Sequence, residues 1–153
     1  MKIAVINGPN LNFMGIREPL IYGSQTLEEI NKQITDEARV ISEQNPVNID
    51  LEFFQSNVEG EIINFIQKCH HDKFYGIIIN PGAFAHYSYA IRDAVASLTM
   101  PIIEVHMSNP YVREEFRQKS VIAPVCRGQI CGFRSYGYIL AIQALIKLNL
   151  EVF

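Results

Sequence analysis

The stretch that decides the fold is Ile3-Ala4-Val5-Ile6-Asn7-Gly8-Pro9-Asn10. Its first four positions are all apolar, without the polar alternation of a strand that has one face in water. Such a run is typical of a strand that is covered on both faces, as in the parallel sheet of an α/β protein. The polar turn that begins at Gly8-Pro9 then marks the end of a central strand.

Apolar runs and helical patterns alternate along the rest of the chain. A capping box, Thr26-Leu27-Glu28-Glu29, begins an apolar pattern of helical spacing that continues to Ile41. Strands are predicted at residues 3–7, 49–53, 77–79, 102–106 and 121–123, and helices at residues 27–41, 56–69, 89–97 and 138–150. This alternation predicts a three-layer α/β/α sandwich of the flavodoxin-like class, with a five-stranded parallel sheet of order 2-1-3-4-5.

The composition narrows the class of protein. Of the 153 residues, 48% are hydrophobic and 19% are charged, as in a globular domain and unlike a disordered chain. The net charge of -3 provides no broad positive field, so we expect no nucleic acid partner. No run of about 18 apolar residues occurs, so we expect no membrane span. Three cysteines are too few for a disulfide framework, and we expect a cytoplasmic protein with reduced thiols.

Polar segments after the predicted strands indicate where a ligand binds, because ligands of parallel sheets bind outside the carboxyl ends of the strands. The four segments are Asn7-Gly8-Pro9-Asn10, Gln55-Ser56, Asn80-Pro81-Gly82 and His106-Met107-Ser108. They are polar and mostly uncharged, and two of them are rich in Gly and Pro. We therefore predict the functional site at this edge of the sheet.

The same segments exclude several common uses of this fold. The loop after the first strand has no hydroxyl and loses an amide donor at Pro9, unlike a phosphate-binding loop for FMN. The strand ends hold no aspartate cluster for Mg²⁺, and the sequence has no P-loop. Cys69-His70-His71 does not suit a metal site, because adjacent residues of a helix point apart. We expect chemistry without a metal or a cofactor.

Glu104 and His106 are two residues apart in a predicted strand, so both side chains point to the same face. A carboxylate beside a histidine fixes the tautomer of the ring and favours its protonated form, as a general acid requires. The alternative is a hydrogen-bonded structural histidine. Asn80 and His86 add an amide and a second imidazole after the preceding strand.

The long connection of residues 8–23, a length typical of lids, contains Arg17 and Tyr22. A neighbouring arginine favours the phenolate form enough for a tyrosine to act as a base near neutral pH. The alternative is a packed tyrosine and a solvated arginine.

The segment Arg113-Glu114-Glu115-Phe116-Arg117 is either a helical salt-bridge face or a segment that turns one arginine inward to bind a carboxylate. A tyrosine base, a histidine acid and an arginine anchor describe elimination of water next to a carbonyl group, on a carboxylate substrate.

With these residues assembled, the sequence closely resembles the type II 3-dehydroquinate dehydratase family over nearly its whole length. Each motif alone is moderately specific, whereas the order and spacing of all of them are highly specific. The shared motifs are Asn7-Gly8-Pro9-Asn10-Leu11-Asn12, Arg17-Glu18-Pro19-x-x-Tyr22-Gly23, Phe54-Gln55-Ser56-Asn57-x-Glu59-Gly60, Ile79-Asn80-Pro81-Gly82-Ala83, His86, Asp93, Glu104-Val105-His106, Ser108-Asn109 and residues 113–117.

The resemblance implies reversible dehydration of 3-dehydroquinate to 3-dehydroshikimate in the shikimate pathway, by a single catalytic domain of residues 1–153. It implies that Tyr22 removes a proton alpha to the ketone and that Arg17 keeps this tyrosine ionised. An enolate then forms, stabilised by a water molecule that Asn10 holds. His106, oriented by Glu104, protonates the departing hydroxyl group.

The resemblance also implies how the substrate is held and how the chain assembles. The residues that it implies as substrate contacts are Asn80, His86, Met107, Ser108 and Arg117. It implies that Arg113 supports the lid, and that the chain forms a homododecamer, a tetramer of trimers. In this assembly Asp93 reaches the site of a neighbouring subunit.

Two other functions stay open on the sequence alone. One is a non-catalytic α/β module that binds a ligand, and the other is a dehydratase of a related β-hydroxy ketone acid. A module of the first kind tolerates the loss of Tyr22 or Arg17, but both residues are present here.

Overall fold

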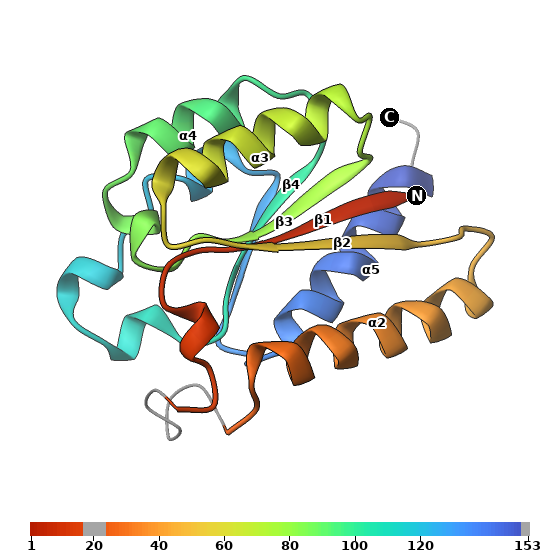
Figure 1. The fold of residues 1–153 in the computed structure, drawn as a ribbon, viewed down its shortest axis with the longest axis horizontal. Helices are drawn as coiled ribbons and strands as arrows, with labels where there is room; N and C mark the ends of the chain where they lie inside the picture. The colour runs from red at the N-terminus through yellow and green to blue at the C-terminus, as the bar shows by residue number, and fades with distance from the viewer. Residues whose placement is uncertain (17–23, 151–153) are drawn as a thin grey trace.

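The structure is a computed structural model that describes residues 1–16 and 24–150. Its centre is a five-stranded parallel sheet of order β2-β1-β3-β4-β5, as predicted (Figure 1). The strands are β1 (Lys2–Asn7), β2 (Asp50–Gln55), β3 (Gly76–Asn80), β4 (Ile102–His106) and β5 (Gly128–Cys131). The helices are α2 (Leu27–Gln44), α3 (Glu59–His71), α4 (Tyr89–Ala96) and α5 (Tyr136–Leu150). Short 3₁₀ turns lie at Leu11–Phe13, Gly82–His86, Pro110–Val112, Glu115–Arg117 and Ala123–Val125.

Helices cover both faces of the sheet, which explains the uninterrupted apolar run of β1. In Figure 1, α3 and α4 lie on one side of the sheet, and α2 and α5 lie on the other. Ile3 and Val5 pack into the core cluster of α2 and α5, whereas Ala4 and Ile6 pack into the cluster of α3 and α4. Both faces of the strand are therefore buried, and no position along it favours a polar residue.

The predicted start of α2 is confirmed in detail. The Thr26 hydroxyl accepts a hydrogen bond from the backbone N–H of Glu29, at 3.2 Å. The Glu29 carboxylate in turn accepts from the backbone N–H of Thr26, at 2.8 Å. This reciprocal pair is the capping box that the sequence predicted, and it satisfies two of the amides that a helix start leaves open.

The prediction of a fifth strand at residues 121–123 is wrong. Val121 and Ile122 precede the 3₁₀ turn Ala123–Val125, and Ala123 is its first residue. The fifth strand lies at Gly128–Cys131 instead. The Ser120 hydroxyl accepts the backbone N–H groups of Ile122 and Ala123, at 3.1 and 3.0 Å, so neither amide is available to a strand partner. The apolar pair Val121 and Ile122 favoured a strand in the sequence. In the structure, both side chains are instead buried from the turn, in the core cluster on the α3–α4 side of the sheet.

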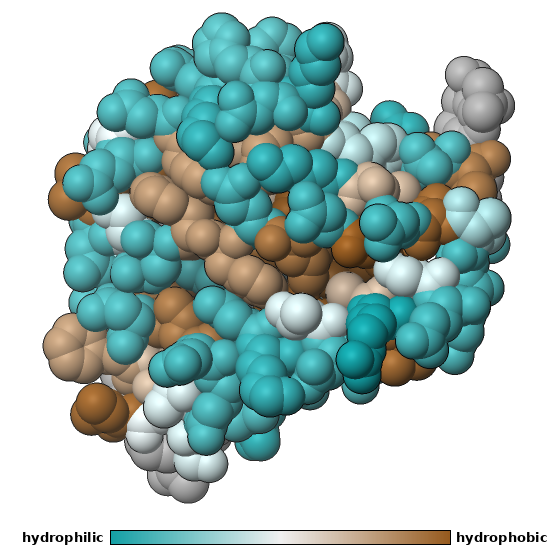
Figure 2. Space-filling view, turned by 45° about the vertical axis from the view of Figure 1, so that its right-hand side comes forward, coloured by the Kyte–Doolittle hydropathy of each residue, from teal (hydrophilic) through white to brown (hydrophobic). Residues whose placement is uncertain are grey.

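The two edge strands are less covered than the central three. Figure 2 shows a band of apolar side chains between two polar layers of the surface. The edge strand β2 runs between α2 and α3, and its residues from Leu51 to Gln55 are only half-buried. On the opposite edge, the first two residues of β5, Gly128 and Gln129, are exposed.

The cysteines are all free thiols, so no disulfide bond joins them. Burial raises the pKa of Cys69 and of Cys126 to about 12, and that of Cys131 to about 11. These thiols therefore stay protonated at neutral pH. None of the described helices is long and apolar enough to cross a membrane.

The carboxyl ends of β1 and β3 meet in direct backbone contact. The N–H of Gly8 donates to the carbonyl of Asn80, at 2.8 Å. A Cβ atom at Gly8 would lie only 2.4 Å from the carbonyl oxygen of Pro81, which is a backbone atom and cannot swing away. Glycine at this position is therefore what lets the two loops come together.

We predict that Gly8→Ala destabilises the protein by about 1–3 kcal/mol, because the added methyl group forces the two loops apart. Gly60→Ala is the matched control, since nothing lies within 4 Å of a Cβ atom in this helical position. The control is expected to leave stability unchanged or to raise it by up to about 1 kcal/mol. Urea unfolding at one fixed protein concentration measures both, and equal midpoints for the two variants would contradict the prediction.

Candidate active site

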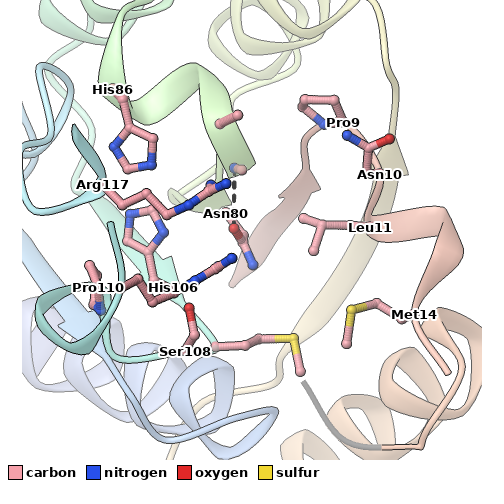
Figure 3. A pocket seen from close by; sticks show the side chains of 14 residues that line it. Pro9, Asn10, Leu11, Met14, Asn80, His86, His106, Ser108, Pro110 and Arg117 are labelled. Atoms are coloured by element: carbon pink, nitrogen blue, oxygen red, sulfur yellow. Dashed lines mark hydrogen bonds between the residues drawn. The ribbon is translucent and has the colours of Figure 1, made fainter. Parts of the chain in front are cut away.

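A cavity of about 290 Å³ opens at the carboxyl edge of the sheet, where the sequence places the site (Figure 3). The loops that follow β1, β3 and β4 form its walls. The residues that line it are Pro9, Asn10, Leu11, Met14, Asn80, Gly82, Ala83, His86, His106, Met107, Ser108, Pro110, Arg113 and Arg117. Eight of the residues predicted for the site are in this lining, counting Asn10, Asn80, His86, His106, Met107, Ser108, Arg113 and Arg117.

The predicted pairing of Glu104 with His106 is present in β4. Nε2 of His106 lies 2.7 Å from Oε1 of Glu104. Glu104 has no exposed surface and lies behind the cavity, whereas His106 is 9% exposed and reaches the cavity wall. The pairing follows from the strand itself, because residues two apart in a strand share one face.

Two further residues, neither of them predicted from the sequence, hold Glu104. The Ser120 hydroxyl donates to Oε2 at 2.9 Å, and Nε2 of Gln129 donates to Oε1 at 2.8 Å. Gln129 reaches Glu104 because β5 pairs with β4 in the register that sets these two residues side by side. Because the fifth strand was predicted at residues 121–123 and not at residues 128–131, the contact between Gln129 and Glu104 was not predicted.

His86 and His106 lie close together above the cavity. Their rings are nearly parallel, with centroids 6.4 Å apart and an angle of 14° between the planes (Figure 3). Nδ1 of His86 lies 2.9 Å from the carbonyl oxygen of Lys119. A carbonyl can only accept, so Nδ1 of His86 carries a hydrogen and Nε2 is the ring nitrogen that can meet a ligand.

A hydrogen-bond network beneath the cavity fixes the Asn80 side chain. Nδ2 of Asn80 donates to the Tyr138 hydroxyl at 2.8 Å, and Oδ1 accepts from the backbone N–H of Gly82 at 3.3 Å. The Tyr138 hydroxyl donates to Oδ1 of Asn7 at 2.7 Å. Burial raises the pKa of Tyr138, so the phenol stays protonated and keeps this direction of donation. Tyr138 was not among the residues predicted for the site, although a tyrosine in an apolar helix is a signal that its hydroxyl has a buried partner.

Arg117 approaches the cavity from the Glu115–Arg117 turn. Its Nε donates to Oε2 of Glu114 at 2.8 Å, and its guanidinium carbon lies 4.7 Å from the centre of the Phe116 ring. A hydrogen bond from the backbone of Glu114 itself, together with the bond from Arg117, holds the pKa of the Glu114 carboxyl below its usual range. Residues 113–117 therefore form no helical face. Glu114 pairs with Nε of Arg117 at 2.8 Å and with Nε of Arg113 at 3.8 Å, and the segment still brings both arginines to the cavity.

Asn10 lies at the mouth of the cavity in a strained backbone conformation. Its φ of 67° is left-handed, a region that asparagine tolerates better than most residues. Its backbone N–H donates to Oδ1 of Asn57, at 2.9 Å. Leu11 and Met14, which follow on the same turn, supply an apolar part of the wall that the sequence analysis did not include.

Besides Glu104, which lies behind His106, three predicted site residues are not in the described lining. Asp93 lies on α4 with 74% of its side chain exposed, and its Oδ1 lies 3.3 Å from Nη1 of Arg92. Arg17 and Tyr22 lie outside the described residues. The described lining contains no carboxylate, tyrosine or lysine, and the described part of the chain holds no cluster of three metal-ligating side chains.

Comparison with known proteins identifies the family of this chain. The sequence profile of the family described as dehydroquinase class II matches residues 1–146. The chain belongs to this family. It is 56% identical to a 3-dehydroquinate dehydratase of Clostridium acetobutylicum over 145 residues, which are 95% of this chain and 96% of that protein. It is 49% identical to a 3-dehydroquinate dehydratase of Campylobacter lari, over 97% of this chain and 88% of that protein.

Solved structures of the dehydroquinase family agree with the fold. The crystal structure of a type II dehydroquinase from Butyrivibrio crossotus superposes with a TM-score of 0.90, at 52% identity. This match covers 95% of the present chain and 97% of that chain. The flavodoxin-like class and the strand order predicted from the sequence are therefore confirmed both by the sheet itself and by its relatives.

We predict that Tyr138→Phe destabilises the protein by about 1–3 kcal/mol, because Asn7 and Asn80 each lose a buried partner. Ligands of the cavity are expected to bind more weakly as well, since the Asn80 amide loses the contact that orients it. Tyr136→Phe is the matched control on the same helix, because Tyr136 is 49% exposed. Thermal and urea unfolding compare the two variants; equal stability would show that the network beneath the cavity contributes little.

Proposed function

We propose that this chain, as a class II dehydroquinase, catalyses the reversible trans-dehydration of 3-dehydroquinate to 3-dehydroshikimate without a metal or cofactor. This is a hydro-lyase reaction of the shikimate pathway. The observation that carries the proposal is the buried Glu104–His106 pair, which opens onto a cavity that two arginines and the Asn80 amide also line. Such a cavity suits an anionic substrate that must lose a hydroxyl group.

In the proposed first step, Tyr22 removes a proton alpha to the ketone, and Arg17 keeps Tyr22 ionised. The electrons of the broken C–H bond pass into the carbonyl group and form an enolate. A water molecule held by Asn10 donates a hydrogen bond to the enolate oxygen. In support of this division of roles, the described lining has no carboxylate or lysine that could act as the base.

In the proposed second step, His106 delivers a proton to the departing hydroxyl group. The enolate electrons re-form the carbonyl and the carbon–carbon double bond as the C–O bond breaks, and the hydroxyl leaves as water. Glu104 supports this step, because its carboxylate lies 2.7 Å from Nε2 of His106 and stabilises the protonated ring. After the reaction, Tyr22 releases its proton to solvent and His106 takes up a proton from solvent, so both groups return to their starting states.

Arg117 is the proposed anchor of the substrate carboxylate. Its contact with Glu114 uses Nε, so its two terminal nitrogens are placed to form a forked pair with a carboxylate. We propose that Nε2 of His86, the Asn80 amide, Ser108 and the Met107 backbone hold the hydroxyl groups of the ring. Arg113 is proposed to support the lid.

We further propose that the chain is a single catalytic domain, that it acts in the cytoplasm, and that it assembles as a dodecamer of four trimers. The position of Asp93 supports the trimer. Its carboxylate is exposed on α4, outside the described lining of its own cavity, where it is available to a neighbouring subunit.

The function is tested by adding 3-dehydroquinate to the purified, metal-free protein and following the ultraviolet absorbance of the conjugated enone. A parallel sample is first treated with borohydride and substrate, which traps an imine but spares an enolate route. Turnover that survives this treatment is the expected result. A folded protein that binds the substrate without turnover would favour the non-catalytic module, and turnover of only other β-hydroxy ketone acids would favour the related dehydratase.

We predict that Tyr22→Phe lowers kcat by roughly 10²–10⁴-fold, the usual contribution of a positioned general base. The KM is expected to change much less, because phenylalanine keeps the aromatic ring and lacks only the ionisable hydroxyl. Steady-state kinetics in the enone assay measure both constants, with Tyr136→Phe as a control at an exposed tyrosine. A kcat near that of the unmodified chain would eliminate Tyr22 as the base.

We predict that Asp93→Asn and Tyr22→Phe, each poorly active alone, recover activity when the two variants are refolded together. A site regains both groups when its own chain carries Tyr22 and its neighbour carries Asp93. Random 1:1 mixing in a trimer produces such sites at roughly a quarter of the total. Mixed oligomers with no more activity than the separate variants would place Asp93 outside the neighbouring site.

A further inference from the structure

We propose that Gln129, together with Ser120, is a positioning residue that keeps Glu104 a pure hydrogen-bond acceptor and so reserves Nδ1 of His106 for proton delivery. This inference deepens the proposed function and rests on His106 being the acid. It concerns residues outside the cavity lining, and it depends on the direction of each hydrogen bond around one buried carboxylate.

The direction of the Ser120 bond follows from the partners of its oxygen. The hydroxyl oxygen accepts the backbone N–H groups of Ile122 and Ala123, at 3.1 and 3.0 Å. A hydroxyl has two lone pairs and one hydrogen, so its only remaining capacity is that hydrogen. The contact of 2.9 Å with Oε2 of Glu104 is therefore a donation to Glu104, and Oε2 must accept.

The direction of the Gln129 bond is equally determined. The amide nitrogen lies 2.8 Å from Oε1 of Glu104, and an amide nitrogen donates only. The register of the sheet sets the two residues side by side on neighbouring strands, so the backbone position from which the Gln129 side chain reaches Glu104 is fixed. Oε1 thus accepts from Gln129 and lies 2.7 Å from Nε2 of His106.

Both oxygens of Glu104 are therefore engaged as acceptors, and the group is a carboxylate without a proton of its own. Nε2 of His106 must carry a hydrogen to bond with it, in the neutral ring as well as in the charged ring. The proton that His106 can take up and release is then the one on Nδ1. Without Gln129 and Ser120, the carboxylate could rotate, and this assignment of the two nitrogens would be lost.

The charged groups around this pair determine how the proton on Nδ1 responds to pH. The His86 ring stacks on the His106 ring, and Arg113 and Arg117 line the same cavity. Behind it, Glu104 also raises the pKa of the thiols of Cys126 and Cys131, so these two groups lie within its field. A change at Gln129 alters only the stabilisation of the Glu104 carboxylate and leaves these other groups in place.

The test compares two substitutions that act on Glu104 in opposite directions. Gln129→Met keeps the length of the side chain and removes the donor, so the less stabilised carboxylate holds the protonated His106 ring more strongly. Gln129→Lys places an ammonium group against the carboxylate and weakens its hold on that ring. Both fit an exposed position of an edge strand. Gln67→Met, at an exposed position of α3, is the control.

Because the proposed acid must be protonated to act, the rate is expected to fall on the alkaline side of the pH profile. We expect Gln129→Met to move this alkaline limb to higher pH and Gln129→Lys to move it to lower pH, each by about half a unit to one unit. The kcat of both is expected to fall roughly tenfold while KM stays within about twofold. The control variant is expected to match the unmodified chain.

Two results would overturn the inference: unchanged kcat and pH profiles in both Gln129 variants, or a fall in kcat with alkaline limbs that do not move in opposite directions. The second result would describe a residue that only supports the fold. Loss of activity in the unmodified chain would instead count against the proposed function. In that case the pH dependence of quinate binding, measured by calorimetry, still compares the two variants, and coincident binding profiles would reject the role of Gln129.

Discussion

The buried carboxylate of Glu104 is the constraint on which the rest of the site depends. An ionised carboxylate with no exposed surface is strongly destabilising unless charged and hydrogen-bonded partners surround it. Here the partners come from three places in the chain: the same strand, the next strand of the sheet, and the turn before it. The need to satisfy Glu104 therefore couples the register of β5 and the shape of the Ser120 turn to the orientation of the His106 ring.

A second buried network performs the same task on the other face of the sheet. Asn7 and Asn80 end the neighbouring strands β1 and β3 in register, and both bond to the Tyr138 hydroxyl of α5. Strand alternation explains why the two networks differ. Glu104 and His106 point to the side of α3 and α4, whereas Asn80 points to the side of α5 and is held from there. The cavity thus receives oriented side chains from both faces of one sheet edge.

Much of this could be predicted from the sequence, because the informative patterns are local. The apolar run of β1, the capping box of α2 and the i, i+2 spacing of Glu104 and His106 each depend on neighbours in the chain. The contacts that were missed join residues far apart: Tyr138 lies 131 residues from Asn7, and Gln129 lies 25 residues from Glu104. The strand at residues 121–123 failed for a related reason, since a side chain, that of Ser120, takes the backbone amides that a strand needs.

The distribution of charge explains why a phenol suits the proposed chemistry better than a carboxylate base. The described lining gathers two arginines and two histidines and holds no acidic group, because Glu104 is withdrawn behind His106. An anionic substrate that becomes an enolate gains negative charge during the reaction, and a carboxylate facing it would oppose both binding and that step. A tyrosine beside an arginine brings its negative charge together with a positive one. The site can then abstract a proton and still present a positive field to the charge that develops.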